Sequence, residues 1–380
     1  MHEHKHNQCR RKVKHRKNVM KLIIFCITVG ISLMFIYYQN LRKEIDARQK
    51  WLETVLAGEK KWILENQGPK GEFYMNGSKA GDVNPYFACM AALGLLAETK
   101  NCLITETEKK AVNRYLDWHT GILLETDGKM GIYRKESGKL IYKEKADSED
   151  GYLGMYLFLM GKYLEKTEST DLPEYWKNGI SLALKKIQSL MQDGITQVSG
   201  ENTTVYLMDN LEVWKGLYEL EHAGIKDMPA VSEMRKKLQA KIEKLFWDDA
   251  NQRWRIIENS DLYHQKEFYP DGVAQIYPLI YEFPVKEKKK QKILYEQFTE
   301  RFQWQKLNKK RNGFLWAMAG MAAAQMGDIN NLLEMIRNYE AEYCENRKYP
   351  LYTGEAGWIC MECEKLYSLY ERKIKTGFLG

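Results

Sequence analysis

Two kinds of apolar pattern alternate along most of the chain. In the first kind, apolar residues recur every three or four positions, as at Trp176, Ile180 and Leu184, with polar residues between them. Such a stripe predicts a surface helix that buries one face. In the second kind, as in GYLGMYLFLMGKYL at 151–164, apolar and small residues lie nearly all round. A helix without a polar face has to be covered on every side.

The two kinds follow one another strictly, which predicts twelve helices in six helical hairpins. The predicted amphipathic helices span 45–66, 105–123, 173–192, 229–246, 286–302 and 329–342. The predicted buried helices span 84–97, 147–165, 206–221, 271–282, 313–326 and 354–371. Six buried helices enclosed by six amphipathic ones predict an all-α fold, an (α/α)6 toroid.

The links between these helices differ in length. A link from a buried to an amphipathic helix is short, such as DMPA at 227–230. The links in the other direction are long and carry β-like patches, as in 129–146 and 248–270. Long links therefore gather at the N-terminal ends of the buried helices, and we expect the functional site there, because loops on a rigid scaffold tend to carry function.

Charge is distributed very unevenly along the chain. Residues 1–21 hold eight lysines and arginines against one acid, so this tail carries the whole net charge of +7. The other 359 residues contain 50 basic and 50 acidic side chains. A neutral body lacks the basic surface that nucleic-acid binding requires, and we expect no nucleic-acid partner.

An uncharged apolar stretch, residues 22–38, follows the basic tail. Seventeen helical residues span roughly 26 Å, enough for a thin bilayer, and the basic side should stay in the cytoplasm. A cleaved signal peptide is the alternative, but the apolar run is long and no convincing cleavage site follows it. We predict a cytoplasmic tail (1–21), a transmembrane signal anchor (22–38) and an extracytoplasmic domain (42–380), held in the cell membrane by a single pass.

The sequence gives little sign of a bound cofactor. Five of the seven cysteines fall in the predicted domain, an odd number without the spacing of a disulfide framework or a metal site. Only His119, His222 and His264 accompany them, too few and too scattered for a zinc enzyme. No phosphate-cradling loop is evident either, so we expect no metal and no organic cofactor.

Carboxylates gather where the predicted buried helices begin. An Asp at a helix start is most often an N-cap that needs no further role. Several acids on one concave rim, however, raise one another's pKa values, as acid–base catalysis requires. The candidate catalytic residues are Asp82, Asp147, Asp150, Asp209, Asp271 and Glu355.

Aromatic and amide side chains accompany these acids. Aromatic rings can stack on the CH faces of a sugar while carboxylates bond to its hydroxyls. The candidate substrate-binding residues are Tyr86, Tyr206, Asn210, Tyr269, Trp316 and Trp358. Glycoside hydrolysis needs two carboxylates across the scissile bond, and Asp150 and Asp209 open consecutive buried helices at the right scale for such a pair.

Five stretches resemble the six-hairpin glycosidase superfamily, nearest to bacterial glycoside hydrolase family 8 and related exopolysaccharide-locus proteins. They are WILENQGPKGEFYM, DSEDGYLGMYLFL, YLMDNLEVWKGLYELE, FYPDGVAQIYPLIY and GEAGWI, within about residues 50–373. The resemblance implies hydrolysis of a polysaccharide, either an exopolysaccharide or a cell-wall glycan. Family 8 enzymes carry their general acid in a Ser-Glu-Gly stretch at the first inner helix. This chain has DVNPYFACM there, so Asp82 or Glu72 would have to take that role, whereas the Asp147–Asp150 stretch does resemble the family's.

Other function classes remain open. A non-catalytic glycan-binding or exopolysaccharide-assembly protein could use the same toroid. A polysaccharide lyase would use a tyrosine with a basic partner, for which Tyr263, His264, Arg253 and Arg255 are candidates. Sugar epimerases of this architecture work through histidines, which do not open the buried helices here, and the DSED stretch matches a terpene-cyclase motif poorly. The sequence therefore favours a membrane-anchored glycoside hydrolase.

Overall fold

The computed structural model describes residues 2–77, 81–137, 139–169, 172–225, 229–258, 260, 267–307, 313–347 and 349–376. The chain divides into two compact units, residues 1–52 with 372–380, and residues 53–371. We call the second unit the helical domain. Tyr263 and His264 lie outside the described residues.

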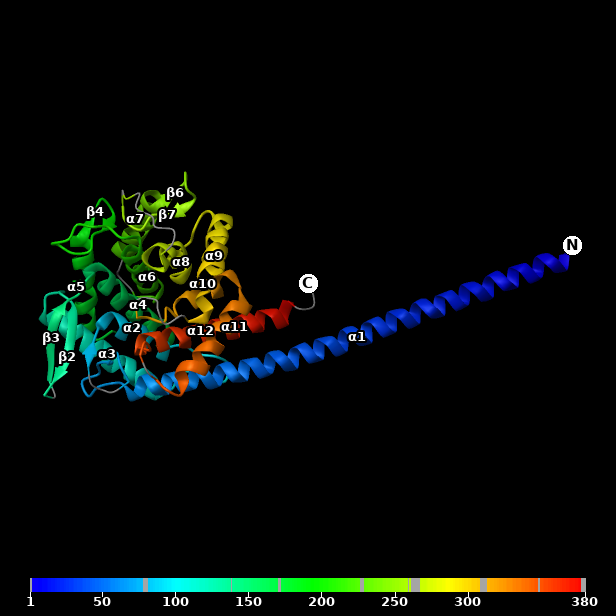
Figure 1. Ribbon diagram of the computed structural model, residues 1–380, viewed down its shortest axis with the longest axis horizontal. Coiled ribbons are helices and arrows are strands. Elements are labelled where there is room, and N and C mark those ends of the chain that lie inside the picture. Colours follow the sequence, from blue (N-terminus) through cyan, green and yellow to red (C-terminus); the bar gives the residue numbers. More distant parts are fainter. Residues whose placement is uncertain are drawn as a thin grey trace. The chain divides into compact units, whose positions relative to one another are not determined.

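Twelve α-helices lie in the described part of the chain, and the predicted (α/α)6 toroid is confirmed (Figure 1). The inner helices are α2 (Pro85–Leu95), α4 (Glu149–Thr167), α6 (Leu207–His222), α8 (Val273–Ile280), α10 (Ala319–Met326) and α12 (Thr353–Thr376). The outer helices are α1 (His2–Glu65), α3 (Glu106–Glu125), α5 (Glu174–Leu190), α7 (Pro229–Phe246), α9 (Lys288–Phe302) and α11 (Ile329–Tyr339).

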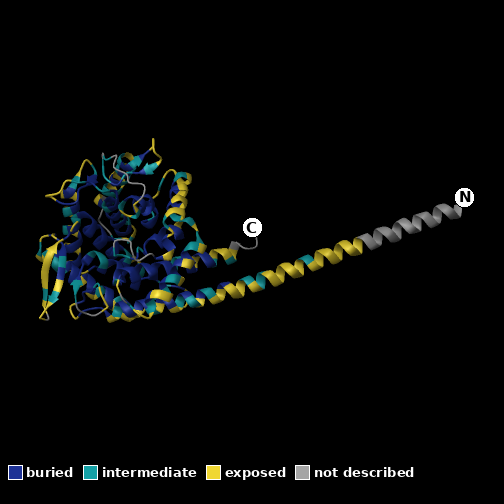
Figure 2. Ribbon diagram, in the orientation of Figure 1, coloured by how far each residue is buried: buried dark blue, intermediate teal, exposed yellow. Residues whose placement is uncertain are grey.

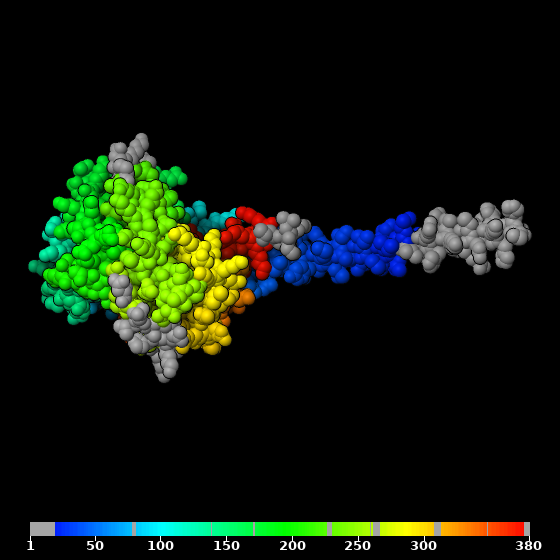
Figure 3. All heavy atoms as spheres, turned by 90° about the horizontal axis from the view of Figure 1, so that it is seen from above, coloured from blue at the N-terminus to red at the C-terminus, as the bar shows by residue number. Residues whose placement is uncertain are grey.

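Burial follows the sequence pattern. Every residue of α8 is buried, and all but two of α2, whereas the outer helices alternate buried and exposed positions (Figure 2). The face of the helical domain seen in Figure 3 is formed largely by the green-to-yellow part of the chain, to which α5, α7 and α9 belong. The one-sided apolar stripes therefore predicted the outer layer correctly.

The inner helices form a closed ring. α4 packs against α2 and α6, and α8 packs against α6 and α10. Small residues let α12 close the ring, because a methyl group on Gly94 of α2 would lie 2.5 Å from the Cα of Gly357 on α12. On its other side, α12 reaches α10 where Glu362 lies against Gly320.

Ion pairs join the C-terminal halves of the inner helices. Lys215 of α6 pairs with Glu219 at 2.7 Å and with Glu282, just after α8, at 2.8 Å. Glu282 also pairs with Lys365 of α12 at 2.5 Å. The two lysines outweigh the effect of burial and lower the pKa of Glu282 to about 2. This end of the ring is therefore tied together by charges, at the opposite helix ends from the long links.

Short strands occupy the long links, as the β-like patches predicted. The longest group is an antiparallel sheet of β1 (Asp82–Val83), β2 (Gly131–Glu136) and β3 (Lys139–Lys145), in that order. Two smaller hairpins are β4 (Met191–Gln192) with β5 (Ile195–Thr196), and β6 (Trp247–Asp248) with β7 (Arg253–Trp254).

Three boundaries differ from the prediction. The first outer helix was expected to start at residue 45, but α1 runs unbroken from His2. The fourth inner helix begins with a π-helical turn, Phe268–Gly272, before α8. The fifth begins at Ala319 instead of residue 313, because the preceding loop is bonded to Glu355, described below. Short 3-10 and π turns also follow α9 (Trp304–Lys306) and α11 (Glu340–Cys344).

The apolar stretch at residues 22–38 lies exposed along α1 (Figure 2). Leu22, Phe25 and Met34 are each more than 60% exposed. By length and composition, this part of α1 could cross a membrane or serve as a signal sequence. An exposed apolar surface of this kind is typical of a segment that contacts lipid or another protein.

Candidate active site

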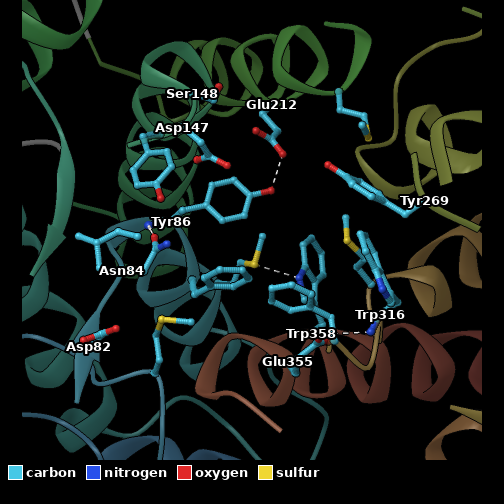
Figure 4. Close-up of a pocket in the computed structure, with 18 of the residues that line it drawn as sticks. Asp82, Asn84, Tyr86, Asp147, Ser148, Glu212, Tyr269, Trp316, Glu355 and Trp358 are labelled. Carbon is cyan, nitrogen blue, oxygen red and sulfur yellow. Dashed lines mark hydrogen bonds between the residues drawn. The ribbon is translucent and has the colours of Figure 1, made fainter. Parts of the chain in front are cut away.

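A pocket of about 570 Å³ is surrounded by the N-terminal ends of all six inner helices (Figure 4). Residues from β2 and β3 complete one wall. The acids that line it are Asp82, Glu144, Asp147, Glu212 and Glu355. The aromatic residues are Tyr86, Phe87, Tyr152, Tyr269, Tyr277, Phe314, Trp316 and Trp358. The pocket thus lies where the long links predicted a site.

Glu212 is a buried acid of the pocket that is held by tyrosine hydroxyls. It lies in α6, is 3% exposed, and accepts hydrogen bonds on Oε1 from the hydroxyls of Tyr86 at 2.5 Å and Tyr277 at 2.7 Å. The Tyr281 hydroxyl approaches the same oxygen at 3.4 Å. Burial raises the pKa of Glu212 to about 7, and the tyrosine hydroxyls offset part of that effect. Glu212 can therefore exchange a proton near neutral pH.

Gly151 leaves the space that the Glu212 carboxyl occupies. A Cβ at position 151 would lie 2.6 Å from Oε2 of Glu212. α4 and α6 also approach closely one turn further on, where a Cβ on Gly154 would lie 2.7 Å from the backbone nitrogen of Val213. The glycine that ends the DSEDG stretch is therefore required by the neighbouring helix.

Glu355 lies in the first turn of α12, on the opposite side of the pocket from Glu212 in the view of Figure 4. Its Oε1 accepts the backbone N–H groups of Leu315 and Trp316, both at 3.1 Å, and its Oε2 accepts that of Ala317 at 2.9 Å. These bonds hold the loop before α10, in which Trp316 has a left-handed φ of +59°. Burial raises the pKa of Glu355 to about 7 in spite of the three donors.

Asp82 lies at the edge of the pocket in a different electrostatic environment. Its carboxylate bonds to Arg134, directly opposite in β2, at 2.7 Å, and to Lys143 of β3 at 2.9 Å. The hydrogen bond from Arg134 contributes most to lowering its pKa. A carboxylate held ionised by two cations is a poor proton donor. Glu72, the other proposed replacement for the family acid, is buried outside the pocket lining and is bonded by the Tyr74 hydroxyl and the backbone of Lys70.

Asp147 is exposed and lines the pocket beside Ser148, the N-cap of α4 (Figure 4). Asp150 lies behind it, fully buried and not among the lining residues. Asp150 accepts hydrogen bonds from the Ser148 hydroxyl at 2.8 Å and from the backbone of Gly151 at 3.0 Å. Its second oxygen is 2.7 Å from the hydroxyl of Thr196. These contacts join α4 to β5.

A proton on Asp150 would complete this hydrogen-bond network. Asn210 donates its two N–H groups to the carbonyls of Thr196 and Tyr206, which leaves its oxygen as an acceptor. That oxygen lies 2.8 Å from the Thr196 hydroxyl, which has only one proton to give. If Asp150 is protonated, it donates to Thr196, and Thr196 donates to Asn210. Burial raises the pKa of Asp150 to about 6, in agreement with this arrangement.

The other predicted acids are also placed outside the lining. Asp209 is half-buried in the first turn of α6, and burial together with the charges of Asp150 and Glu212 raises its pKa well above the ordinary value. Asp271 is buried in the turn before α8, where its carbonyl accepts a hydrogen bond from Gln275. The catalytic roles of Asp150, Asp209 and Asp271 remain predictions.

Four of the six predicted substrate-binding residues line the pocket. Tyr269 and Trp316 form an aromatic wall, with ring centroids 4.8 Å apart, and Tyr269 is 40% exposed. Tyr86 lines it while bonding to Glu212, and the buried Trp358 donates to the sulfur of Met90. The remaining two, Tyr206 and Asn210, lie outside the lining, where Asn210 holds the turn before α6 as described.

Sequence reasoning missed Glu212 and its partner Tyr277. Both lie inside helices, beyond the first turn in which an acid is expected to act as a cap. A signal was present, because a charged residue in a helix that is apolar nearly all round must find a buried partner. Two further charges, Lys215 and Glu219, follow in the same helix and do pair with each other.

Neither His119 nor His222 is among the residues that line the pocket. His119 is buried in α3 with a pKa lowered to about 3 by burial, and His222 stacks on Tyr218 at the end of α6. Arg253 and Arg255 contact Asp248 near the β6–β7 hairpin. Within the described ranges, no group of three or more His, Cys, Asp and Glu side chains is arranged to hold a metal ion.

No protein-family model matches the chain, and no curated protein sequence matches it. Solved structures do match. The chain is similar to a structure described as a wild-type glycosidase, at 11% identity and a TM-score of 0.60, over 85% of this chain and 98% of that one. It is also similar to a D-mannose isomerase, at 10% identity and a TM-score of 0.54, over 84% of this chain and 97% of that one. A β-1,3-1,4-glucanase from Paenibacillus sp. X4 matches at 13% identity and a TM-score of 0.52, over 84% of this chain and 93% of that one. The chain therefore has the helical-toroid fold found in glycosidases, while the resemblance to family 8 in particular stays a prediction.

Proposed function

We propose that the chain is a glycoside hydrolase, with Glu212 as the proton donor and Glu355 as the second carboxylate. The observation that carries the proposal is Glu212 itself, a carboxyl group in the pocket wall whose pKa is raised to about 7. A general acid for glycoside cleavage has to remain protonated near the working pH, and a carboxyl in a water-poor site does so.

The hydrogen bonds of Glu212 fix which oxygen would carry the proton. The two closest tyrosine hydroxyls, of Tyr86 and Tyr277, both donate to Oε1 and use its two lone pairs. The carboxyl proton would therefore lie on Oε2. From there it would pass to the glycosidic oxygen as the glycosidic bond breaks.

Glu355 would act as base or nucleophile across the sugar. Its Oε1 already receives two N–H groups and its Oε2 receives one, so one lone pair of Oε2 is still available. The donors are backbone groups, which keep this oxygen in place during the reaction. Tyr269 and Trp316 would stack on the sugar between the two carboxyls.

Two further lines support a glycan as substrate. Structures similar to this chain include two described as glycosidases with a glutamate-to-alanine substitution, one of them in complex with glucose. We also propose that residues 22–38 anchor the enzyme in a membrane, with the helical domain outside the cell and an exopolysaccharide or cell-wall glycan as substrate.

The test is hydrolysis of a panel of polysaccharides by the full-length protein in detergent, with a chelator present. Release of reducing ends is measured for wild type, Glu212→Gln, Glu355→Gln, Asp150→Asn and Asp209→Asn. We expect Glu212→Gln to lower the rate by at least about a hundredfold, the typical contribution of a general acid. Glu334→Gln, an exposed position on α11, is the matched control.

Each alternative predicts a different pattern. A catalytic pair of Asp150 and Asp209 predicts that their Asn variants lose activity while Glu212→Gln keeps it, which would contradict the assignment. Unsaturated products would indicate a polysaccharide lyase. Glycan binding by wild type without any cleavage would establish the binding-protein alternative.

A further inference from the structure

A row of aromatic rings leads from the pocket to the surface of the helical domain. Tyr269 and Trp316 begin it at the pocket wall. Phe314, which also lines the pocket, follows Trp316 with ring centroids 6.0 Å apart. Tyr352 lies 5.5 Å from Phe314, and Tyr349 lies 6.1 Å from Tyr352, both outside the pocket lining.

The outer end of this row is open to solvent. Tyr349 is 68% exposed, the largest value among the exposed aromatic residues described in residues 53–371. A single exposed tyrosine is ordinary on a protein surface and needs no explanation. Tyr349 differs because its ring continues a row that starts at a pocket.

The position of Tyr349 is also shaped by its surroundings. Its hydroxyl lies over Gly313, so a side chain there would push the tyrosine hydroxyl aside. Gly313 has a φ of +77°, a conformation that favours glycine. Gly313 begins the loop held by Glu355. Phe314 and Trp316 of the row belong to this loop, and Tyr349 contacts it at Gly313.

We propose that Tyr349 and Tyr352 form an outer sugar-binding subsite, and that the substrate is therefore a glycan chain longer than the pocket holds. This inference rests on the proposed function. A sugar chain that follows the row would contact the face of one ring and the edge of the next, because the Trp316–Phe314 and Tyr352–Tyr349 pairs are edge-to-face. Aromatic faces bind through stacking and apolar contact, so the row would bind chains without a charged group.

The test measures how affinity depends on chain length. Full-length Glu212→Gln protein is titrated calorimetrically with gluco-, manno- and galacto-oligosaccharides of two and six units. We expect at least one hexamer to bind about tenfold more tightly than its dimer, and Tyr349→Ala to remove most of that difference. Tyr349→Trp should retain it.

Tyr175→Ala is the matched control, because Tyr175 is 41% exposed on α5 and lines no part of the pocket. It should keep the full length dependence. Thermal melting of Tyr349→Ala must match that of the parent protein, and Tyr349→Trp keeps the test valid if it does not.

The outcomes separate this inference from the proposed function. Wild-type protein that cleaves dimers as readily as hexamers would overturn the outer subsite and leave the hydrolase proposal standing. Binding that depends on length and on Tyr349, without any cleavage, would support the subsite and overturn the hydrolase. Equal affinity for dimers and hexamers, binding to none of the probes, or length dependence that survives Tyr349→Ala would overturn the subsite.

Discussion

Replacing Glu212 by glutamine should stabilise the protein at high pH while abolishing activity. Glutamine has nearly the same shape and keeps a carbonyl oxygen for Tyr86 and Tyr277, but it carries no charge. Ionised Glu212 is buried, and its environment raises its pKa from 4.5 to about 7. The wild-type protein therefore has a destabilising charge that the variant lacks.

The magnitude follows from the pKa shift. A difference of about 2.5 pKa units corresponds to about 3 kcal/mol between the two protonation states. Between pH 4.5 and 7 the folded state binds more protons at Glu212 than the unfolded state, so stability falls as pH rises. The stability that neutral Glu212 contributes to the folded state is fully present below pH 4.5 and is lost once the pH passes 7. Glu355, whose pKa is also about 7, is present in both proteins and cancels from the comparison.

Urea denaturation of the full-length proteins in detergent at pH 5 and pH 8 measures the effect. We expect the variant's advantage in unfolding free energy to be about 2.5 kcal/mol larger at pH 8 than at pH 5. Glu334→Gln should show no such change, since Glu334 is exposed. An advantage of the same size at both pH values would refute the raised pKa of Glu212, and with it the case for this residue as an acid.

Two further predictions concern the loop before α10 and the membrane. Glu355→Ala should lower the unfolding free energy at pH 5 by about 2 kcal/mol or more and change tryptophan emission, because buried backbone N–H groups at Leu315 and Ala317 lose their acceptor; an unchanged urea midpoint would contradict this. Protease added to intact cells should remove residues beyond 42, because the basic tail is expected to stay in the cytoplasm; full protection would refute that orientation.

The fold could be predicted because it is a property of whole helices. Twelve alternating apolar patterns left few ways to cover every buried face, and a toroid is one of them. The contacts that close the ring were harder to predict from the sequence, because they depend on individual residue pairs such as Gly94 against Gly357. The late start of α10 could not be predicted, because it depends on Glu355, about 40 residues further along the chain.

The location of the site was predictable, but most of its chemistry was not. Long links identified the correct helix ends, and Asp82, Asp147 and Glu355 do line the pocket there. Which acids remain protonated depends on their partners in space. Asp82 is held ionised by Arg134 and Lys143 from the other two strands of its sheet, which no spacing along the chain indicates.

The contrast between Asp150 and Glu212 has a physical cause. The first four N–H groups of a helix lack partners within the helix, so short acids in the first turn fold back onto them. Asp150 does this by accepting the N–H of Gly151. Glu212 lies in the second turn, where backbone donors are already used, and it bonds to tyrosine hydroxyls from α2 and α8 instead. Burial raises the pKa of both acids, but only Glu212 also lines the pocket. In this ring Glu212, one turn inside α6, is therefore a stronger candidate for proton donation than Asp150. Glu355, by contrast, lines the pocket from the first turn of α12, because its backbone donors come from the loop before α10.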